Sequence, residues 1–346
     1  MPTTSEIRSR INSITETKKV TDAMYMISSV KMRRARRELE STAPYFRALR
    51  EELGELLHYI PENDSRFFRL PSNEHPYGRA VLLITSDKGL AGSYNQTAIR
   101  AAEALLRAED DLMLFIVGEY GRQYFLSRHA FLSEKFHYSA AFPTVREARR
   151  ICFDLLDEYK RGRLQQIEIV YTHYHAGRPG ETKTRMLLPL SRSDFYDSGS
   201  AGDITEKEYI PSPTAVMDGI VPSYLTGFIY SALVDSYCSE QEARMTAMQS
   251  AGKNAEDMLA QLRLQYHGLR QAAITREMTE IAAGAKALGP GAFQQQIREH
   301  LRLFLLVVPD VESGLPDGKF WVFGECFSRT GDGFFEVIAF LREHWV

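Results

Sequence analysis

Two long stretches almost free of proline lie toward the two ends of this 346-residue sequence. Residues 4–58 contain a single proline, Pro44, and residues 223–288 contain none. A continuous helix rises 1.5 Å per residue, so these stretches predict helices roughly 80 Å and roughly 100 Å long. Helices of this length exceed the width of a compact domain, so much of each must pack on something other than a local core.

Both predicted helices carry a surface suited to packing against another helix. The first has an apolar seam in four-three spacing with a one-residue shift at Thr17 and Lys18, formed by Ile7, Ile11, Ile14, Val20, Met24 and Ile27. In the second, alanine recurs every four residues, at Ala243, Ala247, Ala251 and Ala255. Small side chains let a neighbouring helix backbone approach closely. We therefore expect an antiparallel coiled coil of the two terminal helices.

The hydrophobic period changes between the two long helices. Short apolar runs at 80–85, 112–117, 167–171 and 185–190 predict strands, and they alternate with helical patterns at 95–108 and 144–160. This alternation predicts a Rossmann-like α/β domain with a parallel sheet. The full division is a shaft helix at 1–60, a connector at 61–78, the central domain at 79–192, a linker at 193–222, a second shaft helix at 223–288 and a small α+β extension at 289–346.

Composition argues against several classes of function. The net charge of −3 and pI near 6.3 give no general attraction to nucleic acid or anionic lipid. The three cysteines, Cys152, Cys238 and Cys326, lack the spacing of a zinc site or a disulfide framework. No apolar run reaches the ~18 to 20 residues that span a bilayer, so we expect no direct membrane insertion. No metal, cofactor or catalytic residue is predicted.

The segment Thr85–Asn95, called the signature loop below, follows a predicted strand and precedes a predicted helix. A phosphate-binding loop would sit at this place, but the sequence has neither G-x-x-x-x-G-K-S/T nor G-x-G-x-x-G, and Lys88 comes before the glycines. A structural turn between strand and helix is the favoured interpretation. A nucleotide-binding α/β enzyme is the alternative. His173 and His175 alternate at a strand end, but we find too few further ligands for a metal site.

A basic run on the first helix places five cations in seven residues, at Lys31, Arg33, Arg34, Arg36 and Arg37. Such a run is commonly a solvated helix face. It could also guide the helix toward acidic surfaces of protein partners, as in a free-standing coiled-coil adaptor. Nucleic acid is the weaker partner, because no aromatic platform or recognition motif accompanies the charges.

Three segments of the sequence resemble one family. The first lies within Ser5–Glu40 and includes Ile7-Arg8-Ser9-Arg10-Ile11, Thr17-Lys18-Lys19-Val20-Thr21, Ala23-Met24-Tyr25-Met26 and Lys31-Met32-Arg33. The second is the signature loop. The third comprises Ser239-Glu240-Gln241-Glu242-Ala243-Arg244-Met245-Thr246-Ala247-Met248, Asn254-Ala255 and Arg270-Gln271-Ala272-Ala273-Ile274-Thr275-Arg276-Glu277-Met278-Thr279-Glu280-Ile281. Together they are similar to the gamma subunit of F-type ATP synthases, in the same order along the chain.

The resemblance implies a rotor without catalytic activity of its own. Its partners would be the alpha and beta subunits of the catalytic ring, the epsilon subunit and the membrane ring of c subunits. The protein would lie at the cytoplasmic face of the bacterial plasma membrane, held there peripherally through the complex. Partner contacts are expected at Met24, Lys31, Arg33, Arg34, Arg270, Gln271, Thr275 and Glu277. The segment near Met24 is expected alongside the segment near Arg270.

Three features depart from the family pattern. Ala91 stands where the family usually has cysteine, and Asp22 where it commonly has a basic residue. The family normally ends near Ala287, whereas residues 289–346 follow here, beginning with the helix breaker Gly289-Pro290-Gly291.

Overall fold

The computed structural model describes residues 3–60, 65, 67–68, 78–108, 112–128, 132–133, 135–195 and 208–288. The chain divides into two compact units, Ser5–Arg263 and a second that combines Met1–Thr4 with Leu264–Val346. The expected extension at 289–346 lies outside the described residues, as do most of the connector and part of the linker.

A four-stranded sheet forms the centre of the Ser5–Arg263 unit, in the order β2-β1-β3-β4. The strands are β1 (Arg79–Ile84), β2 (Leu112–Val117), β3 (Gln166–His175) and β4 (Arg178–Leu188). β1 pairs in parallel with β2 and β3, but β4 pairs with β3 in the antiparallel direction. The expected all-parallel sheet is therefore wrong at β4, because two residues between β3 and β4 allow a hairpin and no crossover.

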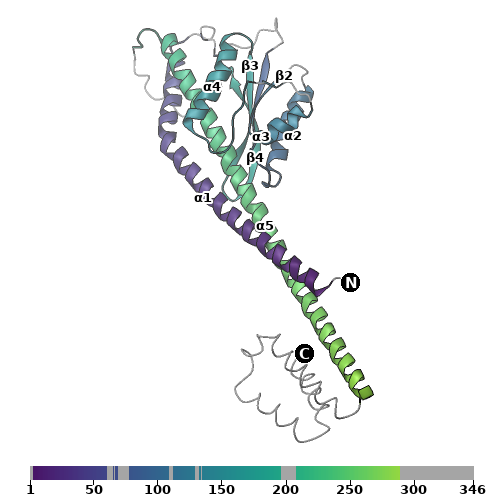
Figure 1. Ribbon diagram of the computed structural model, residues 1–346. Coiled ribbons are helices and arrows are strands. Elements are labelled where there is room, and N and C mark those ends of the chain that lie inside the picture. Colours follow the sequence, from purple (N-terminus) through teal and green to yellow (C-terminus); the bar gives the residue numbers. More distant parts are fainter. Residues whose placement is uncertain are drawn as a thin grey trace. The chain divides into compact units, whose positions relative to one another are not determined.

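Helices cover both faces of this sheet (Figure 1). On one face, Val81 and Leu83 point toward α2 (Tyr94–Ala108) and α3 (Glu119–Leu126), where they join a core with Ala98 and Phe125. On the other face, the alternate residues Leu82 and Ile84 join a larger core. That core includes side chains of α4 (Val145–Lys160) and of the two longest helices. Successive side chains of a buried strand point to opposite faces of the sheet, so β1 contributes to the core on each side.

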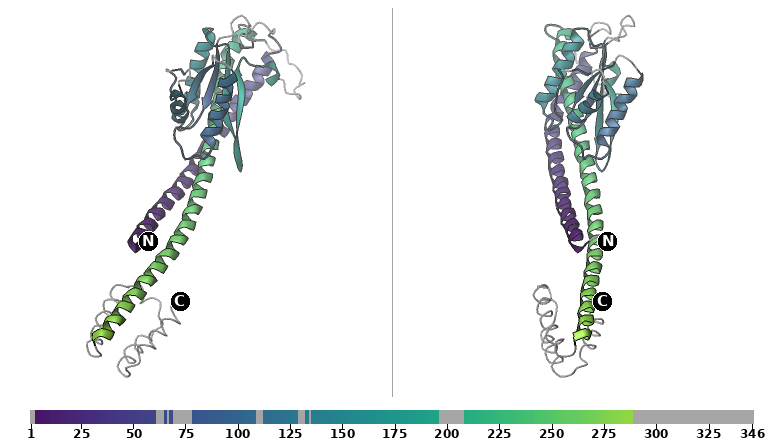
Figure 2. Two further views of the ribbon diagram at one scale, coloured as in Figure 1. Left: turned by 90° about the vertical axis from the view of Figure 1, so that its right-hand side faces the viewer. Right: turned by 45° about the vertical axis from the view of Figure 1, so that its right-hand side comes forward.

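The two long helices run in opposite directions along each other in this unit (Figure 2). They are α1 (Thr4–Leu56) and α5 (Pro213–Leu288). The ring of Phe46 lies 6.4 Å from that of Tyr230, and the ammonium of Lys18 lies 3.0 Å from the carboxylate of Glu256. α5 begins at Pro213, ten residues before the expected start, because proline fits the first turn of a helix. Pro222 follows inside the helix.

Burial along α1 corrects the expected seam. In the first five heptads of α1, every seventh residue is buried or half-buried. These residues are Ile7, Ile14, Thr21, Ser28 and Ala35. Val20 and Ile27, which were to carry the shifted seam, are 55% and 54% exposed. The seam therefore continues without a phase slip. Small polar residues replace the apolar ones, and they let α5 approach closely.

The matching face of α5 follows the same spacing. Its buried residues include Gln241, Met248, Gly252, Ala255 and Leu259, spaced by seven, four, three and four residues. Ala255 is the buried member of the expected alanine series, and the other three are half-buried. An added Cβ at Gly252 would lie 3.5 Å from Asp22 Oδ1. Together with Lys18 and Glu256, this contact sets Met24 opposite the turn of α5 before Gly252, and the expected pairing with Arg270 is wrong.

Candidate functional site

The signature loop and the Ser239–Met248 motif, which is the first part of the third segment that carries the family resemblance, meet in the folded chain. The loop leaves the carboxyl end of β1 and enters α2, while Asp235–Arg244 is a stretch of α5 that packs against it. We call this region the loop–α5 junction. Short polar contacts join the loop to the helix.

The base of the loop is closed by side-chain hydrogen bonds. Asn95 Oδ1 accepts a hydrogen bond from the Ser86 amide at 2.9 Å, and the Asn95 amide group donates to Ser86 Oγ at 2.7 Å. Thr85 Oγ1 donates to the Val117 carbonyl at 3.0 Å and accepts from the Gly121 amide at 3.1 Å. All three side chains are buried, so these bonds replace lost hydration.

Asp87 joins the loop to two neighbouring segments. Its carboxylate accepts hydrogen bonds from the Glu119 amide at 3.1 Å, from the Ala140 amide at 3.0 Å and from Ser139 Oγ at 2.6 Å. A negative charge at the start of α3 is also favoured by that helix's dipole. The side chains of Thr85, Ser86, Asp87 and Asn95 thus serve internal contacts, as expected of a structural turn.

An ion pair on α5 binds the loop tip. The Arg244 guanidinium lies 2.7 Å from Glu240 Oε1, and the two side chains are 14% and 8% exposed. A second guanidinium nitrogen donates to the Gly89 carbonyl at 3.0 Å and to the Lys88 carbonyl at 3.4 Å. Burial raises the pKa of the Glu240 carboxyl, and the positive charge of Arg244 opposes that shift.

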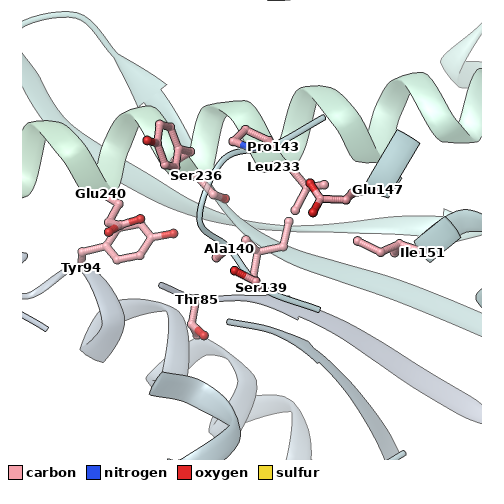
Figure 3. Close-up of a pocket in the computed structure, with 12 residues that line it drawn as sticks. Thr85, Tyr94, Ser139, Ala140, Pro143, Glu147, Ile151, Leu233, Ser236 and Glu240 are labelled. Atoms are coloured by element: carbon pink, nitrogen blue, oxygen red, sulfur yellow. The ribbon is translucent and has the colours of Figure 1, made fainter. Parts of the chain in front are cut away.

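A small pocket adjoins the ion pair. Figure 3 shows Tyr94 and Glu240 beside each other, with Ser236 of α5 and Ser139 of the neighbouring loop also on the lining. Burial, followed by the nearby Glu240 carboxylate, raises the pKa of the Tyr94 hydroxyl, so Tyr94 is neutral at physiological pH. The pocket is part of the packing between the loop and α5.

A further polar contact joins β3 to α5. His173 Nδ1 lies 2.5 Å from Asp235 Oδ2, and Ser236 Oγ accepts a hydrogen bond from the Thr172 amide at 3.1 Å. Burial raises the pKa of the Asp235 carboxyl, and His173 counteracts this effect. His175 pairs with Glu181 at 3.6 Å. Among the described residues no group of three or more His, Cys, Asp or Glu side chains could hold a metal ion.

The predicted partner-binding residues of α1 remain largely open to solvent. Met24 is half-buried, and Lys31, Arg33 and Arg34 are exposed. Arg34 pairs with Glu38 at 3.2 Å and lies 4.7 Å over the ring of Phe142, so part of the basic run also holds the central domain. None of these residues belongs to the loop–α5 junction.

The predicted partner-binding residues of α5 lie in the second unit, where residues 264–288 are described. Arg270, Gln271, Thr275 and Glu277 are all exposed on this stretch of helix. Leu264 in the same stretch is 74% exposed. An exposed apolar side chain among polar ones is compatible with a contact surface, but it specifies no partner.

Sequence reasoning placed no site residue at Glu240 or Arg244. A Glu-Arg pair four residues apart usually forms on a solvated helix face and carries little information. The position of the pair could have indicated that it is buried, because it directly follows the largely apolar stretch Ile229–Cys238. None of the described helices combines the length with the apolar character of a membrane span.

The fold and these motifs define a class: proteins that carry a small α/β domain between long terminal helices. The family model described as ATP synthase matches residues 3–288, which places the chain among the subunits of that enzyme. The ATP synthase gamma chain of Ruminiclostridium cellulolyticum is 37% identical over 287 residues, covering 82% of this chain and 98% of that protein. The ATP synthase gamma chain of Caldicellulosiruptor saccharolyticus is 38% identical over 286 residues, covering 82% and 97%.

Solved structures agree with these relatives. A chain of the central stalk and c-ring structure of Tetrahymena thermophila mitochondrial ATP synthase matches with a TM-score of 0.51 and 26% identity, covering 67% of this chain and 99% of that one. A chain of Euglena gracilis mitochondrial ATP synthase shares the fold, with a TM-score of 0.57 at 14% identity, covering 82% of this chain and 94% of that one. The chain therefore belongs to the ATP synthase gamma chain family. Its function is that of the central-stalk rotor subunit of F-type ATP synthase.

Proposed function

We propose that α1 and α5 form an antiparallel coiled-coil shaft that turns inside a ring of alternating alpha and beta subunits. The central α/β domain and the adjoining part of the shaft would bind the epsilon subunit and the membrane ring of c subunits. The observation that carries this proposal is the matched seven-residue burial on both helices, in one antiparallel register. A seam of this kind makes two helices into one stiff rod.

Ion flow would turn the membrane ring, and the gamma chain would turn with it. Its asymmetric surface would then bias the three catalytic sites through binding, synthesis and release in sequence. A gamma chain is a non-catalytic subunit, so the chemistry belongs to beta. This chain would reside at the cytoplasmic face of the bacterial plasma membrane, held peripherally through the complex.

The exposed side of α1 suits a shaft that slides within a ring. Met26, Ile27 and Val30 are 67%, 54% and 58% exposed, and exposed Arg33 follows on the same side of the helix. Flexible apolar groups adapt to changing neighbours, and the cations of Lys31, Arg33 and Arg34 can be guided by acidic surfaces of alpha and beta. Met24, half-buried at the edge of the seam, would contribute to this bearing surface.

At the far part of α5, Arg270 and Gln271 would contact a loop of a beta subunit. A guanidinium and an amide group can together form charge-assisted, directional hydrogen bonds with a carboxylate-bearing loop. Thr275 and Glu277, exposed on the next turns, would extend the contact.

A double variant tests the beta contact. Arg270→Ala with Gln271→Ala should impair assembly of the complex or its ATP-driven ion pumping, while the isolated chain unfolds at the same urea concentration as wild type. The matched control is Gln96→Ala with Arg100→Ala, which removes the same two side-chain types from exposed positions of α2. Normal assembly and pumping in the first variant would reject the contact.

Copurification tests the partner set as a whole. A tagged full-length chain should bring down alpha, beta and epsilon subunits in defined stoichiometry, as identified by mass spectrometry. Recovery of unrelated acidic proteins in place of alpha and beta would favour the adaptor interpretation. A chain that binds nucleotide by itself in a titration would favour the enzyme interpretation.

A further inference from the structure

We propose that Arg244 is a positioning residue that fixes the tip of the signature loop, Lys88–Leu90, to α5. The loop tip and the shaft helix would then move as one body when the rotor turns. This consequence rests on the function proposed above. The proposal concerns how the loop is held and is separate from the identity of any partner that touches it.

The guanidinium of Arg244 makes its contacts on two sides at once. One nitrogen lies 2.7 Å from Glu240 Oε1, and another donates to the carbonyls of Gly89 and Lys88 at 3.0 Å and 3.4 Å. The planar fork of arginine presents these donors in fixed directions, whereas a lysine ammonium offers one compact charge. The contact therefore depends on arginine and on its orientation by Glu240.

Glu240 has little role other than to hold Arg244. Its side chain is 8% exposed, and burial raises its pKa, so the carboxylate needs a partner at this depth. Lys31 also contributes a favourable positive charge, and Asp87 an unfavourable negative one. Loss of the Arg244 charge would leave a buried carboxylate unpaired, which is costly.

The loop tip needs an external hold. Leu90 has a φ of 64°, a conformation that residues other than glycine adopt at a cost, and its side chain is 63% exposed. Such a conformation persists where surrounding contacts enforce it. The hydrogen bonds of Ser86, Asp87 and Asn95 secure the base of the loop, and Arg244 holds the two carbonyls directly before Leu90.

Two residues after the tip, Gly92 also lies beside the backbone of α5. Its φ is 54°, and an added Cβ would lie 4.0 Å from the Ala243 carbonyl oxygen. The loop therefore lies along the same turn of α5 that carries Arg244. A force applied to Lys88 or Leu90 would pass to α5 through these contacts.

Trypsin digestion measures how firmly the loop tip is fixed, because the bond after Lys88 lies in the tip. In the full-length chain, cleavage between Lys88 and Gly89 should be at least tenfold faster for Arg244→Lys than for wild type, with the new terminus identified by mass spectrometry. Cleavage after Arg161, in a turn at the end of α4, should be unchanged. A merely structural role would accelerate both sites together.

Two further variants protect the test against misfolding. Arg244→Met combined with Glu240→Gln removes the pair without leaving a buried charge, and should free the loop to a similar extent. Arg263→Met, on an exposed position of α5, should leave both cleavage rates at the wild-type level. Equal cleavage after Lys88 in wild type and in both Arg244 variants would overturn the proposal.

The assembled complex tests the mechanical consequence. If the loop and shaft act as one body, Arg244→Lys should lower the number of ions pumped per ATP hydrolysed at least twofold, while Arg263→Met leaves it unchanged. Faster loop cleavage with unchanged pumping would retain the positioning role and reject its use in the rotor. Failure to copurify alpha and beta at all would instead reject the proposed function.

Discussion

At Gly227 the backbone of α5 lies against the ring of Phe46 on α1. A Cβ built there would fall within the ring of Phe46, which itself packs on Tyr230. Gly227→Ala should therefore lower the free energy of unfolding by about 1–3 kcal/mol, the usual cost of overpacking. The control is Gly219→Ala in the same helix, where nothing lies within 4 Å and the exchange should stabilise by about 0.5–1 kcal/mol. Urea unfolding distinguishes them, and equal effects of the two exchanges would contradict this account.

The buried carboxyl of Glu240 should give the fold a measurable pH dependence. Burial raises its pKa above the ordinary value of 4.5, so the folded state keeps this proton at pH values where the unfolded state has lost it. The stability that the protonated Glu240 carboxyl contributes is fully present below pH 4.5 and is lost as the pH rises through its folded-state pKa. The free energy of unfolding of wild type minus that of Glu240→Gln, measured with urea between about pH 4 and pH 7, should therefore decrease with rising pH. A difference that stays constant or increases would contradict the direction of the shift.

At the scale of the element, the long helices were predictable and their contact faces only in part. Length and the scarcity of proline indicated α1 nearly to its end. The helix predicted at 144–160 is α4, with Thr144 as its cap, which accepts a hydrogen bond from the Glu147 amide. The seam was misread because hydrophobicity favoured Val20 and Ile27, whereas close packing selected Thr21 and Ser28. Small polar residues in a tight seam leave no apolar pattern for the sequence to reveal.

The fourth strand illustrates a second limit of the sequence. Its first eight residues, 178–185, are almost entirely polar, because β4 is an edge strand with one neighbour and an exposed face. Strand prediction relied on the apolar end and therefore started at Arg185, too late to reveal the short hairpin. Buried strands such as β2 were placed correctly at both ends, since burial on both faces gives a continuous apolar run.

A cross-link tests the register of the two helices. Gly252 and Thr21 face each other closely: a Cβ at position 252 would lie 3.7 Å from Thr21 Oγ1. Cysteines at these two positions should form a disulfide under mild oxidation in the full-length chain, because a side-chain contact this short is compatible with the limit of about 7 Å between Cα atoms. The matched control, Thr21→Cys with Lys253→Cys, moves one thiol to an exposed position and should remain reduced. With the three native cysteines replaced, non-reducing electrophoresis and mass measurement read the outcome, and cross-linking of the control pair alone would refute the register.

For the molecule as a whole, the sequence located the motifs but not the way they meet. The signature loop and the Ser239–Met248 motif lie about 150 residues apart, and neither indicates by itself that Arg244 would reach the carbonyls of Lys88 and Gly89. That contact depends on how the loop after β1 and this turn of α5 come together in the folded chain. The exposed candidates Arg270 and Gln271 rest on family similarity, since their role would depend on a partner.

The segment 289–346 offers the last test, at the scale of the whole chain. Curated gamma chains align over 97% or 98% of their own length with about four fifths of this chain, and the family model stops at residue 288. The shared rotor function is therefore accounted for by residues 3–288, and we propose that residues 289–346, which lie outside the described part of the chain, are dispensable for it. A chain truncated after Leu288 should then copurify with alpha and beta in normal amounts and support ATP turnover within about twofold of wild type, a change of under about half a kcal/mol in activation free energy. The control is truncation after Arg263, which removes Arg270 and Gln271 and should abolish coupling. Loss of the complex on the shorter deletion, with the truncated chain still helical by circular dichroism, would mean that 289–346 is part of the working shaft.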